Sequence, residues 1–94
     1  MRQLRGRAAI ITGASRGLGT YIGRALAAEG VNLALMARSA EELERVAGEL
    51  RALGVQAIAI TGDVTSAEDR RRAIDATLAE YGRADILVNN AGIE

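Results

Sequence analysis

The stretch Thr12-Gly13-Ala14-Ser15-Arg16-Gly17-Leu18-Gly19 joins a short apolar run, residues 8–11, to a segment with helical spacing. Its glycines, Gly13, Gly17 and Gly19, permit backbone conformations that residues with a Cβ rarely adopt. At the start of a helix, free backbone N–H groups and the positive end of the helix dipole attract anions. The stretch therefore predicts a strand-to-helix turn that binds a phosphate-bearing ligand.

The composition restricts the kind of protein this can be. The 94 residues include twelve Arg, twelve acidic residues and no Lys, which gives a net charge of zero. We expect one small domain, residues 1–94, and no binding to nucleic acid or to a membrane surface. The lack of Cys and His argues against disulfides and metal ligands of the usual kind. No apolar run suits a signal peptide or a membrane span, so we expect a cytoplasmic protein.

Apolar runs alternate with segments of helical spacing along the chain. The expected strands are residues 8–12, 31–36, 55–60 and 84–88. Between them, apolar residues recur three or four positions apart, as on helices with one buried face. The expected buried residues are Leu18, Ile22, Ala25 and Leu26 in the first helix, Leu43, Val46, Leu50 and Leu53 in the second, and Ile74, Leu78 and Tyr81 in the third.

Capping residues indicate where these helices begin and end. Ser39 with Glu42, and Thr65 with Glu68, have the spacing of a capping box, in which side chains bond the free N–H groups of the first turn. We expect the helices to end at Gly30, Gly54 and Gly82.

Strands that alternate with helices predict a three-layer α/β fold with a parallel sheet. The expected strand order is 3-2-1-4, with the first two helices on one face and the third on the other. The order reverses between the first and fourth strands, and ligands of such sheets bind there, at the carboxyl ends. Glycine turns also serve close packing, but the strand–helix–strand context favours a dinucleotide site at residues 12–19.

Three motifs resemble those of the short-chain dehydrogenase/reductase family. Residues 12–19 are similar to its T-G-x-x-x-G-x-G signature, Asp63-Val64 follows the third strand, and Asn89-Asn90-Ala91-Gly92 follows the fourth. With all three in this order, the chain is identified as a member of the family. The resemblance spans the whole chain but only the N-terminal, cofactor-binding part of a typical member. It implies a partial Rossmann fold.

The resemblance also implies roles for individual residues. Ser15 and Arg16 would lie in the phosphate-binding turn, and the backbone of residues 18–19 would approach the pyrophosphate and ribose. Asp63 would bond the adenine amino group, and residues 90–92 would line the adenosine ribose. The candidate cofactor-binding residues are Gly13, Ser15, Arg16, Gly17, Leu18, Gly19, Arg38, Ser39, Asp63, Val64, Asn90, Ala91 and Gly92. An alternative for the amides of Asn89 and Asn90 is that they tie strand ends together without touching the ligand.

The end of the second strand favours NADP(H) over NAD(H). NAD-specific sites place a carboxylate there, but this chain has Arg38 and no acid before Glu41. An arginine can stack on adenine and pair with a 2′-phosphate, which Arg16 could also meet. The alternative is that Arg38 is only a solvated charge. The run Arg70–Arg72 points in three directions on a helix, with Glu68, Asp69 and Asp75 around it. We therefore expect it to form a solvated helix face and not a nucleic-acid site.

The catalytic residues of the family have no counterpart in these 94 residues. Members use a Tyr-x-x-x-Lys pair and an upstream Ser, whereas here Ala25 follows Tyr21, Asp85 follows Tyr81, and no Lys occurs. We therefore expect the cofactor-binding portion of an NADP(H)-dependent reductase, cut short before its catalytic residues and inactive by itself. The alternatives are a non-catalytic nucleotide-binding module, or a self-assembling module, that is complete at this length.

The apolar strand at residues 84–88 bears on assembly. In a full family fold it would be an interior strand, but here it would form an edge of the sheet. Exposed apolar edges pair with other chains. We therefore expect a homo-oligomer, formed through residues 84–88 or by the exchange of elements between copies.

Overall fold

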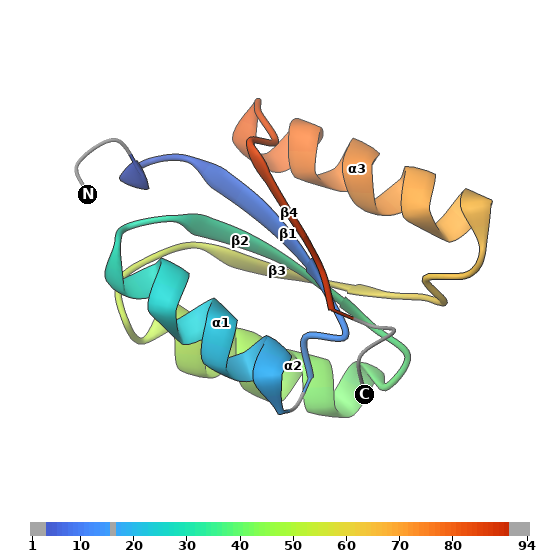
Figure 1. The fold of residues 1–94 in the computed structure, drawn as a ribbon, viewed down its shortest axis with the longest axis horizontal. Coiled ribbons are helices and arrows are strands. Elements are labelled where there is room, and N and C mark those ends of the chain that lie inside the picture. Colours follow the sequence, from blue (N-terminus) through green and yellow to red (C-terminus); the bar gives the residue numbers. More distant parts are fainter. Residues whose placement is uncertain (1–3, 16, 91–94) are drawn as a thin grey trace.

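The computed structural model describes residues 4–15 and 17–90. A four-stranded parallel sheet lies between helices on both of its faces (Figure 1). The elements in chain order are β1 (Ala8–Thr12), α1 (Leu18–Ala28), β2 (Asn32–Ala37), α2 (Ala40–Arg51), β3 (Ala57–Thr61), α3 (Ala67–Tyr81) and β4 (Ile86–Asn89). No helix of this described part is long and apolar enough to cross a membrane.

The strand order is β3-β2-β1-β4, which confirms the predicted topology. Ile10 of β1 pairs with Ala34 on one side and with Leu87 on the other. Helices α1 and α2 cover one face of the sheet and α3 covers the other, also as predicted (Figure 1). Because all the strands run the same way, the connections that leave β1, β2 and β3 lie at one edge of the sheet, together with the end of β4.

Two unequal cores hold these layers together. The face under α1 and α2 carries the larger side chains, among them Ile11, Leu33, Leu35, Leu43, Val46 and Leu50. The face under α3 buries fewer residues, namely Ile10, Ala34, Met36, Ile60 and Ala73. Burial of aliphatic surface drives folding, so the α1–α2 face supplies most of the stability.

The buried face of α1 differs from the prediction. Small residues line it, namely Gly19, Gly23 and Ala27, while Ile22 and Leu26 are only half-buried. Leu18 is 46% exposed, and Ala25 is also exposed. The reason is close packing, because a Cβ on Gly23 would lie 3.3 Å from Leu50 Cδ1. The helix turns its smallest residues toward the sheet and α2.

The predictions of which residues α2 and α3 bury were also partly wrong. Leu53 is exposed because α2 ends at Arg51, before that position. In α3 the buried residues are Ala73 and Thr77, while Ile74 and Leu78 are exposed. This helix contacts β1 and β2. The side of the helix that carries Ile74 faces a pocket that β4 also lines. Tyr81 is half-buried as expected, and its hydroxyl donates to Leu33 O at 2.7 Å.

The capping predictions were right for α2 and wrong for α3. Ser39 Oγ accepts a hydrogen bond from Glu42 N at 3.3 Å, as predicted. The residue that caps α3 is Ser66, whose Oγ accepts from Asp69 N at 3.1 Å. Thr65 does not cap the helix because its hydroxyl donates to Asp63 Oδ1 at 2.7 Å. At the other end of α3, Gly82 has a left-handed conformation (φ 74°), as expected of a terminating glycine.

Candidate functional site

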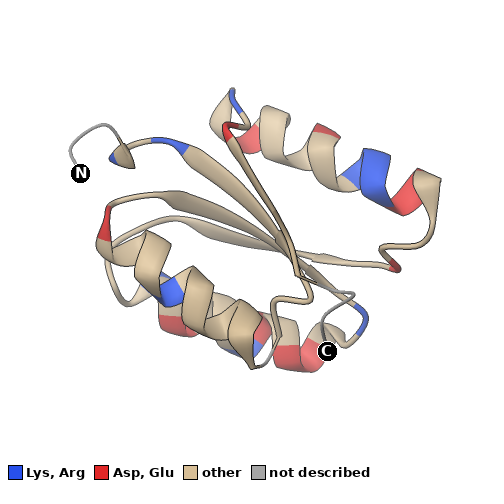
Figure 2. Cartoon of the chain, in the orientation of Figure 1, with Lys and Arg blue, Asp and Glu red and all other residues tan. Residues whose placement is uncertain are grey.

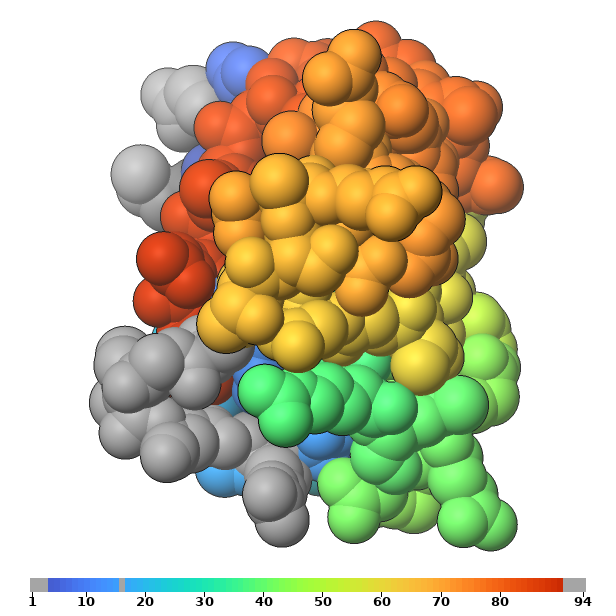
Figure 3. Space-filling view, turned by 90° about the vertical axis from the view of Figure 1, so that its right-hand side faces the viewer, coloured from blue at the N-terminus to red at the C-terminus, as the bar shows by residue number. Residues whose placement is uncertain are grey.

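Three connecting segments meet at the carboxyl edge of the sheet. They are the β1–α1 turn (residues 13–17), the β2–α2 junction (38–39) and the β3–α3 loop (62–66). Figure 3 looks onto this edge, where the yellow and orange β3–α3 segment lies above the green start of α2. The end of β4 reaches the same edge beside β1, since Asn89 pairs with Thr12. Residues from all three predicted motifs are therefore brought together.

The glycines in and just after the β1–α1 turn are required for different physical reasons. Gly13 (φ 64°) and Gly17 (φ 63°) have positive φ angles, which other residues adopt only with strain. Gly19 is needed for space, because a Cβ there would overlap the Gly13 carbonyl oxygen and lie 2.9 Å from Asn90 Nδ2. Ala14 N donates to Met36 O at 3.3 Å, which ties the turn to the end of β2.

The N-terminus of α1 differs in chemistry from those of α2 and α3. Its N-cap is Gly17, and among the described residues no side chain caps it and its first turn has no acid. In contrast, α2 and α3 have serine caps and two acidic residues each in their first turns. Free N–H groups with no carboxylate beside them suit an anionic group of a ligand. Arg16, which was predicted to meet the same ligand, lies outside the described residues.

Asn90 connects the end of β4 to this turn. It is 1% exposed, its backbone N donates to Thr12 Oγ1 at 3.0 Å, and its Nδ2 donates to Gly13 O at 3.2 Å. These contacts agree with the alternative stated for this amide, in which it ties strand ends together. Thr12 opens the predicted glycine stretch but was not among the predicted site residues. The signal for its role is a hydroxyl residue at the end of β1. Ala91 and Gly92 lie outside the described residues.

Arg38 and Asp63 face each other across the ends of β2 and β3. Arg38 Nη2 lies 3.7 Å from Asp63 Oδ1, and the Arg38 side chain is 78% exposed. Thr65 donates to the same carboxylate oxygen from its backbone N (2.9 Å) and its hydroxyl (2.7 Å). Mainly because of these two bonds, and to a smaller extent because of Arg38, the pKa of Asp63 lies below its ordinary value. An arginine and an ionised carboxylate are therefore both available to a ligand at neutral pH.

The other two candidates near Arg38 have less distinctive surroundings. Ser39 uses its hydroxyl to cap α2, and its side chain is exposed. Val64 is half-buried, and its carbonyl oxygen accepts from Arg70 Nη1 at 2.7 Å. The backbone of Val64 is therefore held by α3, through an arginine that is exposed as predicted.

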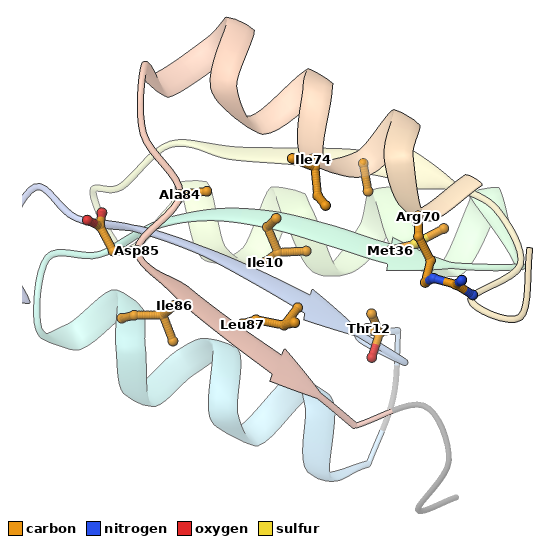
Figure 4. Close-up of a pocket in the computed structure, with 10 residues that line it drawn as sticks. Ile10, Thr12, Met36, Arg70, Ile74, Ala84, Asp85, Ile86 and Leu87 are labelled. Atoms are coloured by element: carbon orange, nitrogen blue, oxygen red, sulfur yellow. The ribbon is translucent and has the colours of Figure 1, made fainter. Parts of the chain in front are cut away.

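An apolar pocket of about 360 Å³ lies between α3 and the sheet, on the face that α3 covers (Figure 4). Ile10 from β1, Ile74 from α3 and Leu87 from β4 line it. Thr12 and Arg70 line both this pocket and a second one that includes Asn89, so the apolar surface continues to the carboxyl edge.

Neither tyrosine is placed as an acid/base group of this site. Tyr81 bonds Leu33 O near the start of β2, which is the opposite edge of the sheet. Burial is the main reason that the pKa of Tyr81 rises to about 12, so its hydroxyl keeps its proton. Tyr21 lies exposed on the outside of α1.

Comparisons with known proteins agree with this geometry. Residues 7–94 match the family model described as short chain dehydrogenase. The chain belongs to this family. It is 42% identical over 88 residues to a peroxisomal 2,4-dienoyl-CoA reductase of Arabidopsis thaliana, a match that covers 94% of this chain and 30% of the relative.

Solved structures of this family superpose closely on the chain. L-sorbose reductase from Gluconobacter frateurii, in complex with NADPH and L-sorbose, has a TM-score of 0.90 at 37% identity over 94% of this chain and 34% of its own. NAD⁺-bound xylitol dehydrogenase has a TM-score of 0.86 at 32% identity, covering 90% of this chain and 33% of its own. The chain thus spans about a third of the length of these relatives. Because the two structures hold different cofactors, similarity alone does not choose between NADP(H) and NAD(H).

Proposed function

We propose that this chain is the NADP(H)-binding part of a short-chain reductase. The observation that carries the proposal is Arg38, which follows β2 directly with its guanidinium largely exposed. Its ion pair with Asp63, at 3.7 Å and open to solvent, contributes little stability, so a 2′-phosphate can replace the carboxylate as partner. A carboxylate at the position of Arg38 would instead suit the ribose 2′-hydroxyl of NAD.

Each end of the cofactor has its own group of residues in this proposal. The turn at residues 13–19, Arg16 included, binds the pyrophosphate through N–H groups and the dipole of α1. Arg38 and Ser39 meet the 2′-phosphate, Asp63 and Val64 meet the adenine, and residues 91–92 line the ribose. Asn90 holds the end of β4 to the turn. When bound, the nicotinamide donates or accepts a hydride. Because these 94 residues contain no Lys, a Tyr-x-x-x-Lys pair for a carbonyl or alcohol substrate has to come from elsewhere in the whole protein.

Titration with NADPH and NADH, followed by cofactor fluorescence, tests the proposal. We expect the chain to bind NADPH more tightly than NADH, and Arg38→Asp to remove a preference of about tenfold to a hundredfold. Arg45→Asp, which makes the same charge change on the outer side of α2, should keep the preference. If Arg38→Asp keeps it too, the 2′-phosphate assignment is wrong. If the unaltered chain binds neither cofactor below millimolar concentration, the whole proposal is wrong.

We also propose that the chain forms a homo-oligomer through β4. Among the described residues, β4 pairs with β1 alone, and Leu87 is 69% exposed. Figure 2 shows charged residues on the helices and loops, while the strands carry none. Ile74 and Leu87 line one pocket beside this uncharged strand (Figure 4), and a second copy can cover it.

Analytical ultracentrifugation at tens of micromolar tests this assembly. We expect the unaltered chain to sediment as a dimer or larger species and Leu87→Glu as a monomer. Leu53→Glu, a matched change of an exposed leucine beyond α2, should leave the assembly intact. A clean monomer of the unaltered chain would rule the proposal out.

A further inference from the structure

Side chains of α3 bind the backbone of the β3–α3 loop on both sides of Asp63. Asp69 Oδ2 accepts from Asp63 N at 2.9 Å. Arg72 Nη2 donates to Thr61 O at 2.9 Å and to Asp69 Oδ1 at 3.2 Å. Arg70 Nη1 donates to Val64 O at 2.7 Å. The residues before, at and after the predicted adenine contact are therefore each bonded to the same helix.

The loop has little room to shift between α3 and the end of β2. A Cβ on Gly62 would lie 2.9 Å from Met36 Cε, 3.0 Å from Arg72 Nη2 and 3.2 Å from Asp69 Cβ. Gly62 N donates to Ala37 O at 2.9 Å, which fixes the other side of the loop to β2. Packing and hydrogen bonds thus restrain the same few backbone atoms.

Asp69 is itself held in place. Its backbone N donates to Ser66 Oγ, the cap of α3, and its two carboxylate oxygens bond Asp63 N and Arg72 separately. With both oxygens engaged in charge-assisted bonds, the orientation of the carboxylate is defined. The Asp63 carboxylate takes no part in this network, because its Oδ1 faces Thr65 and Arg38.

We propose that Asp69, Arg70 and Arg72 are positioning residues that hold the Asp63–Val64 segment in place for the adenine end of the cofactor. This inference rests on the proposed function, since it is the proposed cofactor that the segment meets. In this role the three side chains act through the backbone of the loop. They fix the backbone from which the Asp63 carboxylate projects, so the ligand does not have to order the loop when it binds.

Arg71 shows that this role is specific to its neighbours. Its side chain is 80% exposed and lies 3.9 Å from Asp75 on the next turn of the helix. Asp75 is the ion-pair partner of Arg71, whereas Arg70 and Arg72 each donate to a carbonyl oxygen before α3. All three arginines are exposed, as expected, but Arg70 and Arg72 also bind backbone carbonyls.

The test compares Arg72→Gln with Arg71→Gln, which removes an equal charge one residue away. The first readout is amide exchange and the chemical shift of Asp63 N–H in the ligand-free chain. The second is the dissociation constant of two probes, adenosine 2′,5′-bisphosphate and inorganic pyrophosphate. We expect Arg72→Gln to speed Asp63 exchange and weaken bisphosphate binding by about tenfold each, with pyrophosphate binding unchanged. Arg71→Gln should leave all four measured quantities unchanged.

Two further variants keep the test sharp. Arg72→Lys keeps the charge and one donor and should give an intermediate bisphosphate constant. Asp69→Asn keeps the shape of the side chain and, if Arg72→Gln does not fold, should show the same selective loss. Equal weakening of both probes, or no change in either readout for Arg72→Gln, would overturn the positioning role alone. If the unaltered chain does not bind the bisphosphate, the proposed function fails as well.

Discussion

The connections that follow β1 and β3 both lead from the carboxyl edge of the sheet into a helix, but different kinds of residue hold them in place. The β1–α1 turn uses glycines, and its described residues include no charged side chain. The β3–α3 loop is capped by Ser66 and bonded by Asp69, Arg70 and Arg72. One connection leaves the N–H groups of its helix without a side-chain cap, whereas the other supplies its own partners.

The difference indicates what each segment contributes to a binding site. A turn with glycines at positive φ brings the backbone close to a ligand, but neighbouring residues must hold it, as Asn90 does at Gly13 O. A loop bonded by charged side chains presents a single carboxylate, Asp63, in a defined place. Exchanging features between the two connections therefore tests both of them.

Adding one methyl group to the β1–α1 connection should have the largest effect. Gly19→Ala would force its Cβ against the Gly13 carbonyl oxygen, which is backbone and cannot move aside. We expect a loss of about 3 kcal/mol in the free energy of unfolding, measured by urea denaturation. Gly48→Ala is the matched control, because Gly48 lies within α2 with nothing within 4 Å of its Cβ position. It should stabilise the chain by about 0.5–1 kcal/mol. An equal loss in both variants would refute the close-packing role of Gly19.

The sequence predicted the strand order and the glycine turn because both depend on local patterns. Alternation of strands and helices determines the layers, and the glycines in the sequence mark a turn that needs positive φ angles. The burial of α1 was harder to predict, because the small Gly23 faces Leu50 from a distant part of the chain. A scale of hydrophobicity places Leu18 inside, whereas close packing places glycine there.

The support of Asp63 was missed for a similar reason. Three arginines in a row look like a solvated face, and only the position of the β3–α3 loop shows which of them reach it. Likewise, two hydroxyl residues precede α3, and the sequence does not show that Asp63 engages Thr65 and leaves Ser66 to cap the helix. The roles of Arg38 and Asp63 toward a cofactor remain predictions.

The serine cap of α3 should account for the next largest effect. Ser66→Ala removes the acceptor of Asp69 N and should lower the free energy of unfolding by about 1 kcal/mol. Thr65→Ala removes a hydroxyl next to it that bonds only the partly exposed Asp63 carboxylate, so its effect on unfolding should be smaller. Urea denaturation of both variants measures the difference. A larger loss for Thr65→Ala would restore Thr65 as the cap and contradict the assignment of Ser66.

An acidic residue in the first turn of α1, such as α2 and α3 already have, should raise the free energy of unfolding and weaken the binding of anionic ligands. Leu18 lies in the first turn of α1 and is partly exposed, so Leu18→Glu and Leu18→Gln lose similar packing. Relative to glutamine, the glutamate should stabilise the helix by about 0.3–1 kcal/mol through the dipole. The same charge should repel pyrophosphate and NADPH, and isothermal titration should show weaker binding to Leu18→Glu than to Leu18→Gln. If the charge improves binding, the α1 N-terminus is not the anion site.

Acid should loosen the β3–α3 connection and leave the β1–α1 turn unchanged. The pKa of Asp69 lies below its ordinary value of 3.8, first because Asp63 N donates to it and second because of Arg72. The pKa of Asp63 is lowered as well, mainly by Thr65, with Arg38 facing it. A carboxyl with a lowered folded pKa contributes its full stability above 3.8, and this contribution is lost as the pH falls through the folded value.

The backbone amide of Asp63 reports this change directly, because its hydrogen bond weakens when Asp69 is protonated. In spectra recorded from pH 5 down to pH 2, we expect the amide proton of Asp63 to shift with a midpoint below 3.8, and that of Gly13 to stay nearly constant. In Asp69→Asn the side chain at position 69 cannot titrate, so the Asp63 shift should become much smaller. A midpoint above 3.8, or equal movement of Gly13, would mean that the charged bonds do not distinguish the two connections. A low midpoint confined to the β3–α3 loop would mean that the ionised carboxylates, together with the packing around Gly62, hold that loop at neutral pH.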